Sequence, residues 1–201
     1  MIHLLIKENH FKDKRVAVKL VMAKDEQEKG KKVFLSAFAR EYRHRLEILG
    51  KHGLDLVTYP FPRLSPLADH KTLNYFYYYR AGIYARSHAA DEAVILNPDG
   101  SVSETNTAGI FAVEKKTVLV PKSDHSLSSV TLNSVLTMLS DKGYDIKRKK
   151  MDCEEFYSYS TIFLANALMG VVKVLSVDGK RIEQDKGICS MMNEYLFKTN
   201  F

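Results

Sequence analysis

The sequence predicts an α+β fold, and three observations carry that prediction. Runs of alternating apolar residues are joined by turns such as Asp178-Gly179, a pattern typical of antiparallel hairpins. Residues 72–90 and 128–142 instead have apolar residues at helical spacing. A chain of 201 residues, 45% of them hydrophobic, can bury the core of one generous domain or two small ones. Hairpins combined with separate helices are typical of the α+β class.

Residues 1–67 are expected to form a partial small α/β domain and a linker. Residues 15–42 hold two strand-like runs on either side of the charged stretch KDEQEKGKK, which predicts a hairpin. The following stretch, LEILGKHGLDLVTYP, predicts a glycine turn and a short strand that stops at Pro60, because proline ends regular structure. Residues 68–201 are expected to form a larger, complete domain.

The larger domain is expected to alternate between helices and strands. The tyrosine-rich segment Thr72–Ala90 predicts a helix that is mostly buried. Residues 91–122 read as strand, turn, polar segment, strand, turn and strand, which is an antiparallel pattern. A helix with hydroxyl N-cap candidates then runs from Ser128 to Gly143 and leads into a strand. The rest predicts a short helix, a strand, a hairpin and a terminal helix over 152–160, 161–170, 171–182 and 187–201.

Composition argues against several functional classes. The longest apolar stretch is broken by Gly170 and Lys173, so no membrane span is expected. Charges arrive by Lys7 without a small-residue cleavage site, so we expect a cytoplasmic protein with no secretory signal. The two cysteines, Cys153 and Cys189, lie far apart without metal-ligand spacing, which indicates neither a disulfide framework nor a metal site.

The formal net charge of +6 is spread along the chain. The densest basic group, KRKK at 147–150, follows a predicted helix and begins a strand, so we interpret it as a solvated strand edge. No nucleic-acid partner and no membrane partner is therefore expected. A small anionic substrate or cofactor suits the same charge.

Three segments together resemble the class IV aminotransferase family: HKTLNY at 70–75, DEAVILNPDGSVSE at 91–104 and FLANALMG at 163–170. That family uses pyridoxal 5'-phosphate (PLP) and includes branched-chain and D-amino-acid aminotransferases and aminodeoxychorismate lyase. The resemblance covers roughly residues 15–201. It implies the PLP-dependent fold type IV, similar to D-amino-acid aminotransferase, with a PLP-binding domain at 68–201. It also implies a truncated small domain that lacks the family's usual amino-terminal segment.

The resemblance assigns the central chemistry to Lys71 and Glu104. Lys71 matches the lysine that forms the Schiff base with PLP and moves a proton at the substrate's α carbon; a partly desolvated amine is nucleophilic near neutrality. Glu104 matches the carboxylate that pairs with the pyridine nitrogen and keeps it protonated. Without the motif, each has an ordinary alternative: a lysine with its stem along the surface and an exposed glutamate in a turn.

Two further pairs match the phosphate-binding residues of the family. Val130 and Thr131 stand at a predicted helix start, where free N–H groups and the helix dipole favour an anion. Asn166 and Ala167 follow a predicted strand and match the second pair. The alternative for the first pair is a plain helix cap.

Four positions depart from the family pattern. Serines 128 and 129 replace the usual glycine before the phosphate turn, and Gly109 replaces a common asparagine. Lys24 stands where many members have a substrate-binding arginine, and it lacks that residue's fork of donors.

The resemblance implies a homodimeric enzyme with one of two reactions. We expect the lyase reaction, because the stretch ANALMG at 165–170 is most similar to aminodeoxychorismate lyase, which makes 4-aminobenzoate and pyruvate for folate biosynthesis. The alternative is an amino-acid aminotransferase acting on branched-chain or D-amino acids. A third alternative is a non-catalytic protein that keeps the fold and has lost the pocket.

Overall fold

The computed structural model describes residues 2–24, 33–183 and 187–198, and the chain divides into two compact units, Met1–Leu49 and Gly50–Phe201. The division lies earlier than the expected boundary after residue 67. The reason is strand β3 (Leu54–Thr58), which pairs with strands of the larger unit and so belongs to its sheet.

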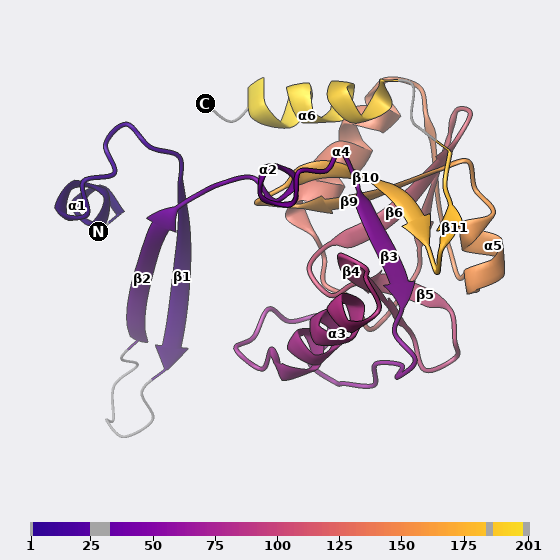
Figure 1. The fold of residues 1–201 in the computed structure, drawn as a ribbon, viewed down its shortest axis with the longest axis horizontal. Helices are drawn as coiled ribbons and strands as arrows, with labels where there is room; N and C mark the ends of the chain where they lie inside the picture. Colours follow the sequence, from indigo (N-terminus) through magenta and orange to yellow (C-terminus); the bar gives the residue numbers. More distant parts are fainter. Residues whose placement is uncertain (1, 25–32, 184–186, 199–201) are drawn as a thin grey trace. The chain divides into compact units, whose positions relative to one another are not determined.

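The smaller unit contains the expected hairpin. Strands β1 (Val16–Lys24) and β2 (Val33–Glu41) pair antiparallel from Val16 opposite Glu41 to Lys24 opposite Val33 (Figure 1). The connecting stretch between these strands lies outside the described residues. Two short helices, α1 (Ile2–Glu8) and α2 (Arg45–Leu49), were not expected from the sequence.

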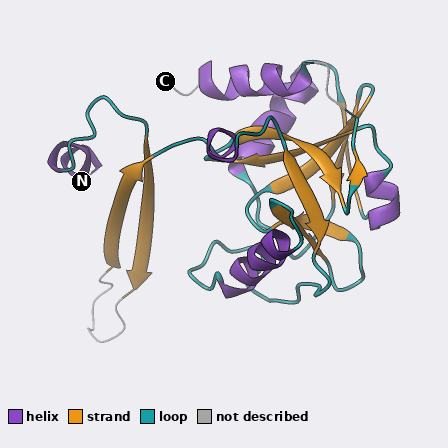
Figure 2. Ribbon diagram, viewed as in Figure 1, coloured by secondary structure: helices purple, strands orange, loops and turns teal. Residues whose placement is uncertain are grey.

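The larger unit is built on one nine-stranded mixed sheet with the strand order β5-β4-β3-β10-β9-β6-β7-β8 and with β11 beside β10 (Figure 2). The pairs β3/β4, β3/β10 and β7/β8 are parallel, and the other pairs are antiparallel. The remaining strands are β4 (Glu92–Leu96), β5 (Val102–Thr105), β6 (Gly109–Glu114), β7 (Thr117–Pro121), β8 (Asp145–Lys149), β9 (Thr161–Asn166), β10 (Gly170–Val177) and β11 (Lys180–Arg181).

Four helices accompany this sheet: α3 (Phe76–Ser87), α4 (Val130–Asp141), α5 (Cys153–Tyr157) and α6 (Ile188–Lys198). Helix α3 connects the parallel strands β3 and β4, and α4 connects β7 and β8. Apolar residues of α4 and α6 share a core with β6, β7, β9 and β10, including the fully buried Phe111, Phe163 and Met192. The structure confirms the predicted α+β class. It also confirms that helices occur in these four regions and that β10 and β11 form a hairpin.

Two expectations about the larger unit were wrong. The segment after the Asp99-Gly100 turn was expected to be an irregular polar stretch, but it contains strand β5. All four side chains of β5 are buried where the strand pairs with β4. The tyrosine-rich helix begins at Phe76 rather than Thr72, and it is not mostly buried, since α3 buries only one face against β4.

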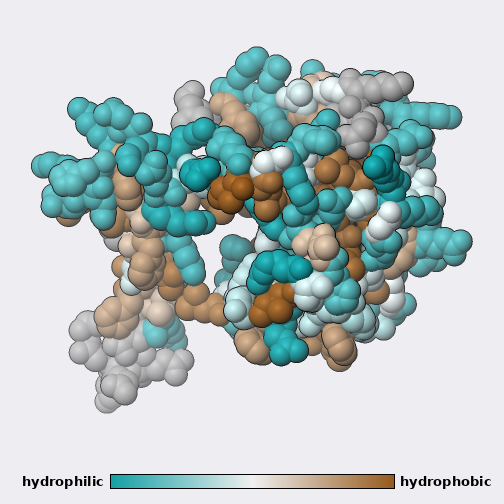
Figure 3. Space-filling view, in the orientation of Figure 1, coloured by the Kyte–Doolittle hydropathy of each residue, from teal (hydrophilic) through white to brown (hydrophobic). Residues whose placement is uncertain are grey.

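The other face of α3 carries exposed apolar residues. Phe76 is 67% exposed and Tyr79 is 55% exposed. In the view of Figure 3, apolar side chains appear among hydrophilic ones over the region that α3 occupies in Figure 1.

Three residues of the basic group at 147–150 lie on strand β8, which ends the sheet order and is mostly exposed, and Lys150 follows it. Lys147 Nζ lies 3.3 Å from Asp145 Oδ2, Lys149 pairs with Glu155, and Lys150 Nζ lies 2.6 Å from Asp99 Oδ2. Three of the four charges thus have an acidic partner nearby, as expected for a solvated edge. No helix within the described ranges has the length and apolar character needed to cross a membrane.

Candidate active site

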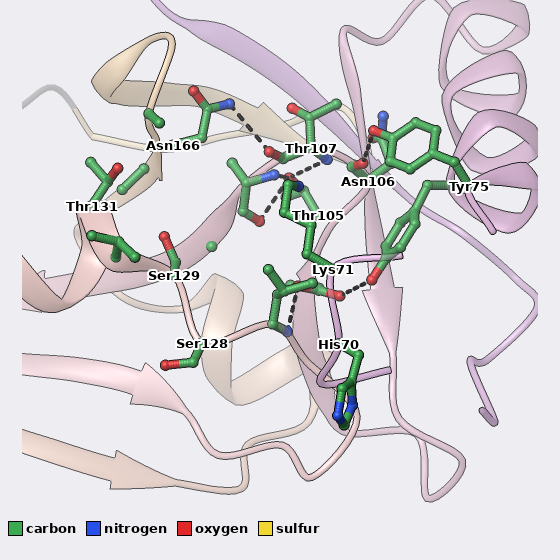
Figure 4. Close-up of a pocket in the computed structure, with 18 of the residues that line it drawn as sticks. His70, Lys71, Tyr75, Thr105, Asn106, Thr107, Ser128, Ser129, Thr131 and Asn166 are labelled. Atoms are coloured by element: carbon green, nitrogen blue, oxygen red, sulfur yellow. Dashed lines mark hydrogen bonds between the residues drawn. The ribbon is translucent and has the colours of Figure 1, made fainter. Parts of the chain in front are cut away.

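One cavity of the larger unit brings the predicted site residues together. It has a volume of about 240 Å³ and is bordered by the loop before α3, strand β5, the start of α4 and the turn after β9. All six residues implied by the resemblance line it: Lys71, Glu104, Val130, Thr131, Asn166 and Ala167. Figure 4 shows Lys71 and Tyr75 on one side, Ser129 and Thr131 on the other, and Thr105–Thr107 between them.

Lys71 lies in the loop between a turn and the first residue of α3, and its side chain is exposed. A partly desolvated lysine was expected, and the structure differs here, because the Lys71 side chain is exposed although it lines the cavity. Its positive charge still acts on the carboxylate of Glu104. The amine is therefore accessible to a ligand that enters the cavity.

Glu104 is the buried carboxylate at the floor of the site, with only 6% of the residue exposed. Its Oε1 accepts hydrogen bonds from Tyr78 Oη at 2.5 Å and from Arg63 Nη1 at 3.2 Å. Its Oε2 accepts one from the backbone N–H of Leu127 at 3.3 Å. Three donors from three segments of the chain thus fix the direction of this carboxylate.

Burial raises the pKa of Glu104 to about 7. The loss of hydration is the largest effect and disfavours the charged form. The Leu127 N–H, the Arg63 guanidinium and the Lys71 ammonium act in the opposite direction. A cationic group placed beside Glu104 would add to these and lower its pKa again.

The start of α4 provides the opposite wall. Ser129 is the N-cap, and its Oγ accepts the N–H of Leu132 at 3.2 Å. The N–H groups of the first turn, including those of Val130 and Thr131, have no partner inside an α-helix, and no acidic residue stands in this turn of α4. Gly109 permits the close approach of this turn to β6, because a Cβ there would lie 3.0 Å from Leu132 Cδ2.

The side chain of Asn166, which the resemblance assigns to phosphate binding, makes hydrogen bonds to the protein backbone. Its Oδ1 accepts the backbone N–H groups of Leu168 at 2.9 Å and Met169 at 2.7 Å, and its Nδ2 donates to the carbonyl of Thr107 at 3.2 Å (Figure 4). The amide thus shapes the turn between β9 and β10 and ties it to the β5–β6 loop. Ala167 is exposed in that turn and lines the cavity.

The sequence did not single out Arg63 or Tyr78. Arg63 is only 8% exposed, and its guanidinium carbon lies 4.3 Å from the centroid of the Tyr78 ring. A signal for it existed: an arginine in the apolar stretch YPFPRL needs a carboxylate if it is buried. Tyr75 also lines the cavity, and its hydroxyl donates to the carbonyl of Asn106 at 3.1 Å. Lys24 lies in the smaller unit at the end of β1.

The family model described as amino-transferase class IV matches residues 1–177. The chain belongs to the class IV aminotransferase family. A branched-chain-amino-acid aminotransferase of Pseudomonas aeruginosa is 30% identical over 98 residues, which are 49% of this chain and 32% of that protein. A branched-chain-amino-acid aminotransferase-like protein of Arabidopsis thaliana is 28% identical over 106 residues, which are 53% of this chain and 19% of that protein. The matched segments thus span a third or less of these class IV relatives.

Solved structures of the family share the fold. A protein of Legionella pneumophila described as a candidate 4-amino-4-deoxychorismate lyase has a TM-score of 0.81 and 21% identity, over 98% of this chain and 73% of its own. The branched-chain aminotransferase of Escherichia coli has a TM-score of 0.80 and 17% identity, over 96% and 66%. A hypothetical aminotransferase of Mycobacterium tuberculosis, solved in a PLP-bound form, has a TM-score of 0.82 and 16% identity, over 96% and 72%. The fold is therefore PLP-dependent fold type IV, and PLP is the cofactor that membership of this family supports.

Proposed function

We propose that the cavity holds PLP and that the chain is part of a PLP-dependent enzyme acting on amino-containing substrates. The observation that carries this proposal is the convergence of Lys71, Glu104 and the start of α4 on one cavity. These groups suit the three reactive parts of the cofactor. Lys71 offers an accessible amine for its aldehyde, Glu104 a carboxylate for its ring nitrogen, and the first turn of α4 offers N–H donors for its phosphate.

Each residue has a separate task in this proposal. When bound, PLP supplies an electron-accepting ring to the reaction. Lys71 would hold the cofactor through its amine and would be the base and acid that moves the proton at the substrate's α carbon. Glu104 keeps a negative charge beside the ring nitrogen, and the residues around it exclude water from that pairing.

Aminotransfer is the reaction we favour, with an amino acid as donor and a 2-oxo acid as acceptor. The support is the set of curated relatives named branched-chain-amino-acid aminotransferase.

The lyase reaction, 4-amino-4-deoxychorismate to 4-aminobenzoate and pyruvate, is the second candidate. The stretch Asn166–Met169 and the Legionella pneumophila structure favour it. This stretch is weaker support for the lyase than its sequence suggests, because the Asn166 amide accepts the N–H groups of Leu168 and Met169 and so shapes the turn.

A product assay tests the proposed reaction. Purified protein supplied with PLP is incubated with branched-chain or D-amino acids and 2-oxoglutarate, and separately with aminodeoxychorismate, beside the Lys71→Ala variant. Glutamate formed only by the unaltered protein supports aminotransfer, and 4-aminobenzoate formed only by it supports the lyase. If unaltered protein and variant give equal traces of both products, the catalytic proposal fails and the non-catalytic alternative stands.

We also propose that the functional form is a homodimer. The residues flanking Lys71 in the chain include large apolar side chains that are exposed in the single chain: Leu64 at 79%, Leu73 at 67% and Phe76 at 67%. A second copy of the chain that packed against them would remove these side chains from water.

A further inference from the structure

The hydroxyl of Tyr78 has a specific position that core packing does not require. Tyr78 is 8% exposed on the buried face of α3, and its Oη lies 2.5 Å from Glu104 Oε1. A phenylalanine would fill the same space without this contact. The hydroxyl therefore has a polar task at the one buried carboxylate of the cavity.

The ring of Tyr78 is held on several sides. The Arg63 guanidinium lies over it at 4.3 Å, the Tyr77 ring meets it edge-on at 5.8 Å, and the Tyr75 ring lies tilted at 5.4 Å. Arg63 also donates to the same Oε1 at 3.2 Å. With its ring enclosed, Tyr78 cannot turn its hydroxyl away without disturbing both Arg63 and α3.

We infer that Tyr78 is a positioning residue: its hydroxyl, together with Arg63, fixes the direction and the charge of the Glu104 carboxylate. Since both donors use Oε1, the other oxygen, Oε2, is left with the longer bond from the Leu127 N–H. Oε2 is thus the oxygen with capacity for a further donor from the cavity side.

The meaning of this arrangement for the ring nitrogen of PLP rests on the proposed function. A carboxylate kept charged by Tyr78 is ready to pair with a protonated ring nitrogen. The arrangement itself concerns only residues of this chain, so it is testable without the cofactor.

The first test is a titration of Glu104 in the protein without PLP, followed by the carboxyl carbon of isotopically labelled glutamate and assigned with Glu104→Gln. Unaltered protein is expected to titrate near pH 7. Tyr78→Phe removes a donor that favours the charged form, so the midpoint should rise by about one pH unit or more. The groups facing Glu104 that remain are Arg63, Lys71 and Tyr77.

Tyr79→Phe is the matched control, because Tyr79 is the next residue of α3 and is 55% exposed. It should leave the Glu104 midpoint unchanged. A second variant guards against misfolding: 3-fluorotyrosine at position 78 keeps the shape but is a stronger donor, and should lower the midpoint. Equal midpoints in unaltered protein, Tyr78→Phe and the fluorinated protein would overturn the inference.

A second readout concerns the loaded protein. If PLP binds, the pH dependence of its visible spectrum should shift in Tyr78→Phe and not in Tyr79→Phe, while a merely structural role would move neither. If PLP fails to bind to unaltered protein, the proposed function is refuted, whereas the titration without cofactor still decides the role of Tyr78.

Discussion

At the residue scale, the site depends on how one buried carboxylate is kept in place. Burial removes water from the Glu104 carboxylate, and hydrogen bonds from Arg63, Tyr78 and the Leu127 N–H replace part of that lost hydration. Burial is the stronger effect and leaves its pKa raised to about 7. The site without cofactor therefore contains a carboxyl that takes up a proton near neutral pH.

Glu104 should make the stability of the cofactor-free protein depend on pH. The unfolded chain releases this proton near the ordinary value of 4.5, and the folded chain releases it near 7, so between these values the folded state holds more protons. The free energy of unfolding should fall as pH rises through this window, by about 3 kcal/mol in all. Urea unfolding of Glu104→Gln and unaltered protein at pH 4, 5.5 and 7.5 measures it. A stability difference that stays constant across these pH values would contradict the account.

The sequence predicts some of the residues that meet at the cavity and does not predict others, for a physical reason. Lys71 and Glu104 are recognisable because each lies in a short contiguous motif that resembles the family, KTLNY at 71–75 and DEAVILNPDGSVSE at 91–104. Arg63 and Tyr78 are not, because their role depends on contacts across 41 and 26 residues of separation. Helical spacing identifies a buried face and does not tell where a hydroxyl on that face points.

At the element scale, the start of α4 is the proposed anion site, and its geometry depends on the N-cap Ser129. Loss of the cap lets the first turn fray and moves the N–H groups of Val130 and Thr131. The helix end would then lose part of its attraction for a phosphate.

Ser129→Ala should lower the free energy of unfolding by about 1 kcal/mol and also weaken PLP binding several-fold. Asp152→Ala is the matched control, since Asp152 caps α5 in the same way by accepting the N–H of Glu155, at 2.8 Å. The control should lose similar stability and keep its affinity for PLP. Thermal unfolding and fluorescence titration with PLP measure the two effects. Equal affinity in both variants would show that the start of α4 does not bind the phosphate.

Elements with a periodic pattern were predicted, and elements set by tertiary contacts were not. The strands of the first hairpin and helix α4 follow their apolar spacing. Strand β5 reads VSET and lacks such spacing, although all four of its side chains are buried where it pairs with β4 at the edge of the sheet. Helix α3 begins late, since Thr72 Oγ1 accepts the N–H of Asn74 and forms a turn where the helix was expected.

At the scale of the whole molecule, the α+β class followed from local patterns, while the boundary between the units did not. Strand β3 is near in sequence to the smaller unit, but it pairs in parallel with β4 and β10. Such pairings join residues that are far apart in sequence, and local patterns do not specify them. The expected burial of the tyrosine-rich helix failed because apolar composition does not tell how many faces of a helix are covered, and α3 buries only the face that packs against β4.

Phe76→Asp should disrupt the proposed homodimer, because it places a charge in the centre of the exposed apolar residues near Lys71. The dimer dissociation constant should rise on the order of tenfold or more. Phe197→Asp on α6, where the side chain is 52% exposed, is the control and should leave the dimer intact. Light scattering during size exclusion measures both. A monomeric unaltered protein, or equal effects of the two variants, would contradict a dimer formed through this face.

The central claim is that Lys71 holds PLP in this cavity, and one measurement tests it most directly. Purified protein and Lys71→Ala are each loaded with PLP, freed of excess, examined by visible absorption, reduced with borohydride and digested for mass spectrometry. The account predicts a visible band in the unaltered protein that reduction removes, with the added mass of reduced cofactor on the peptide containing Lys71, and neither signal in the variant. A colourless protein, or an adduct on another lysine at equal yield in both proteins, would contradict it.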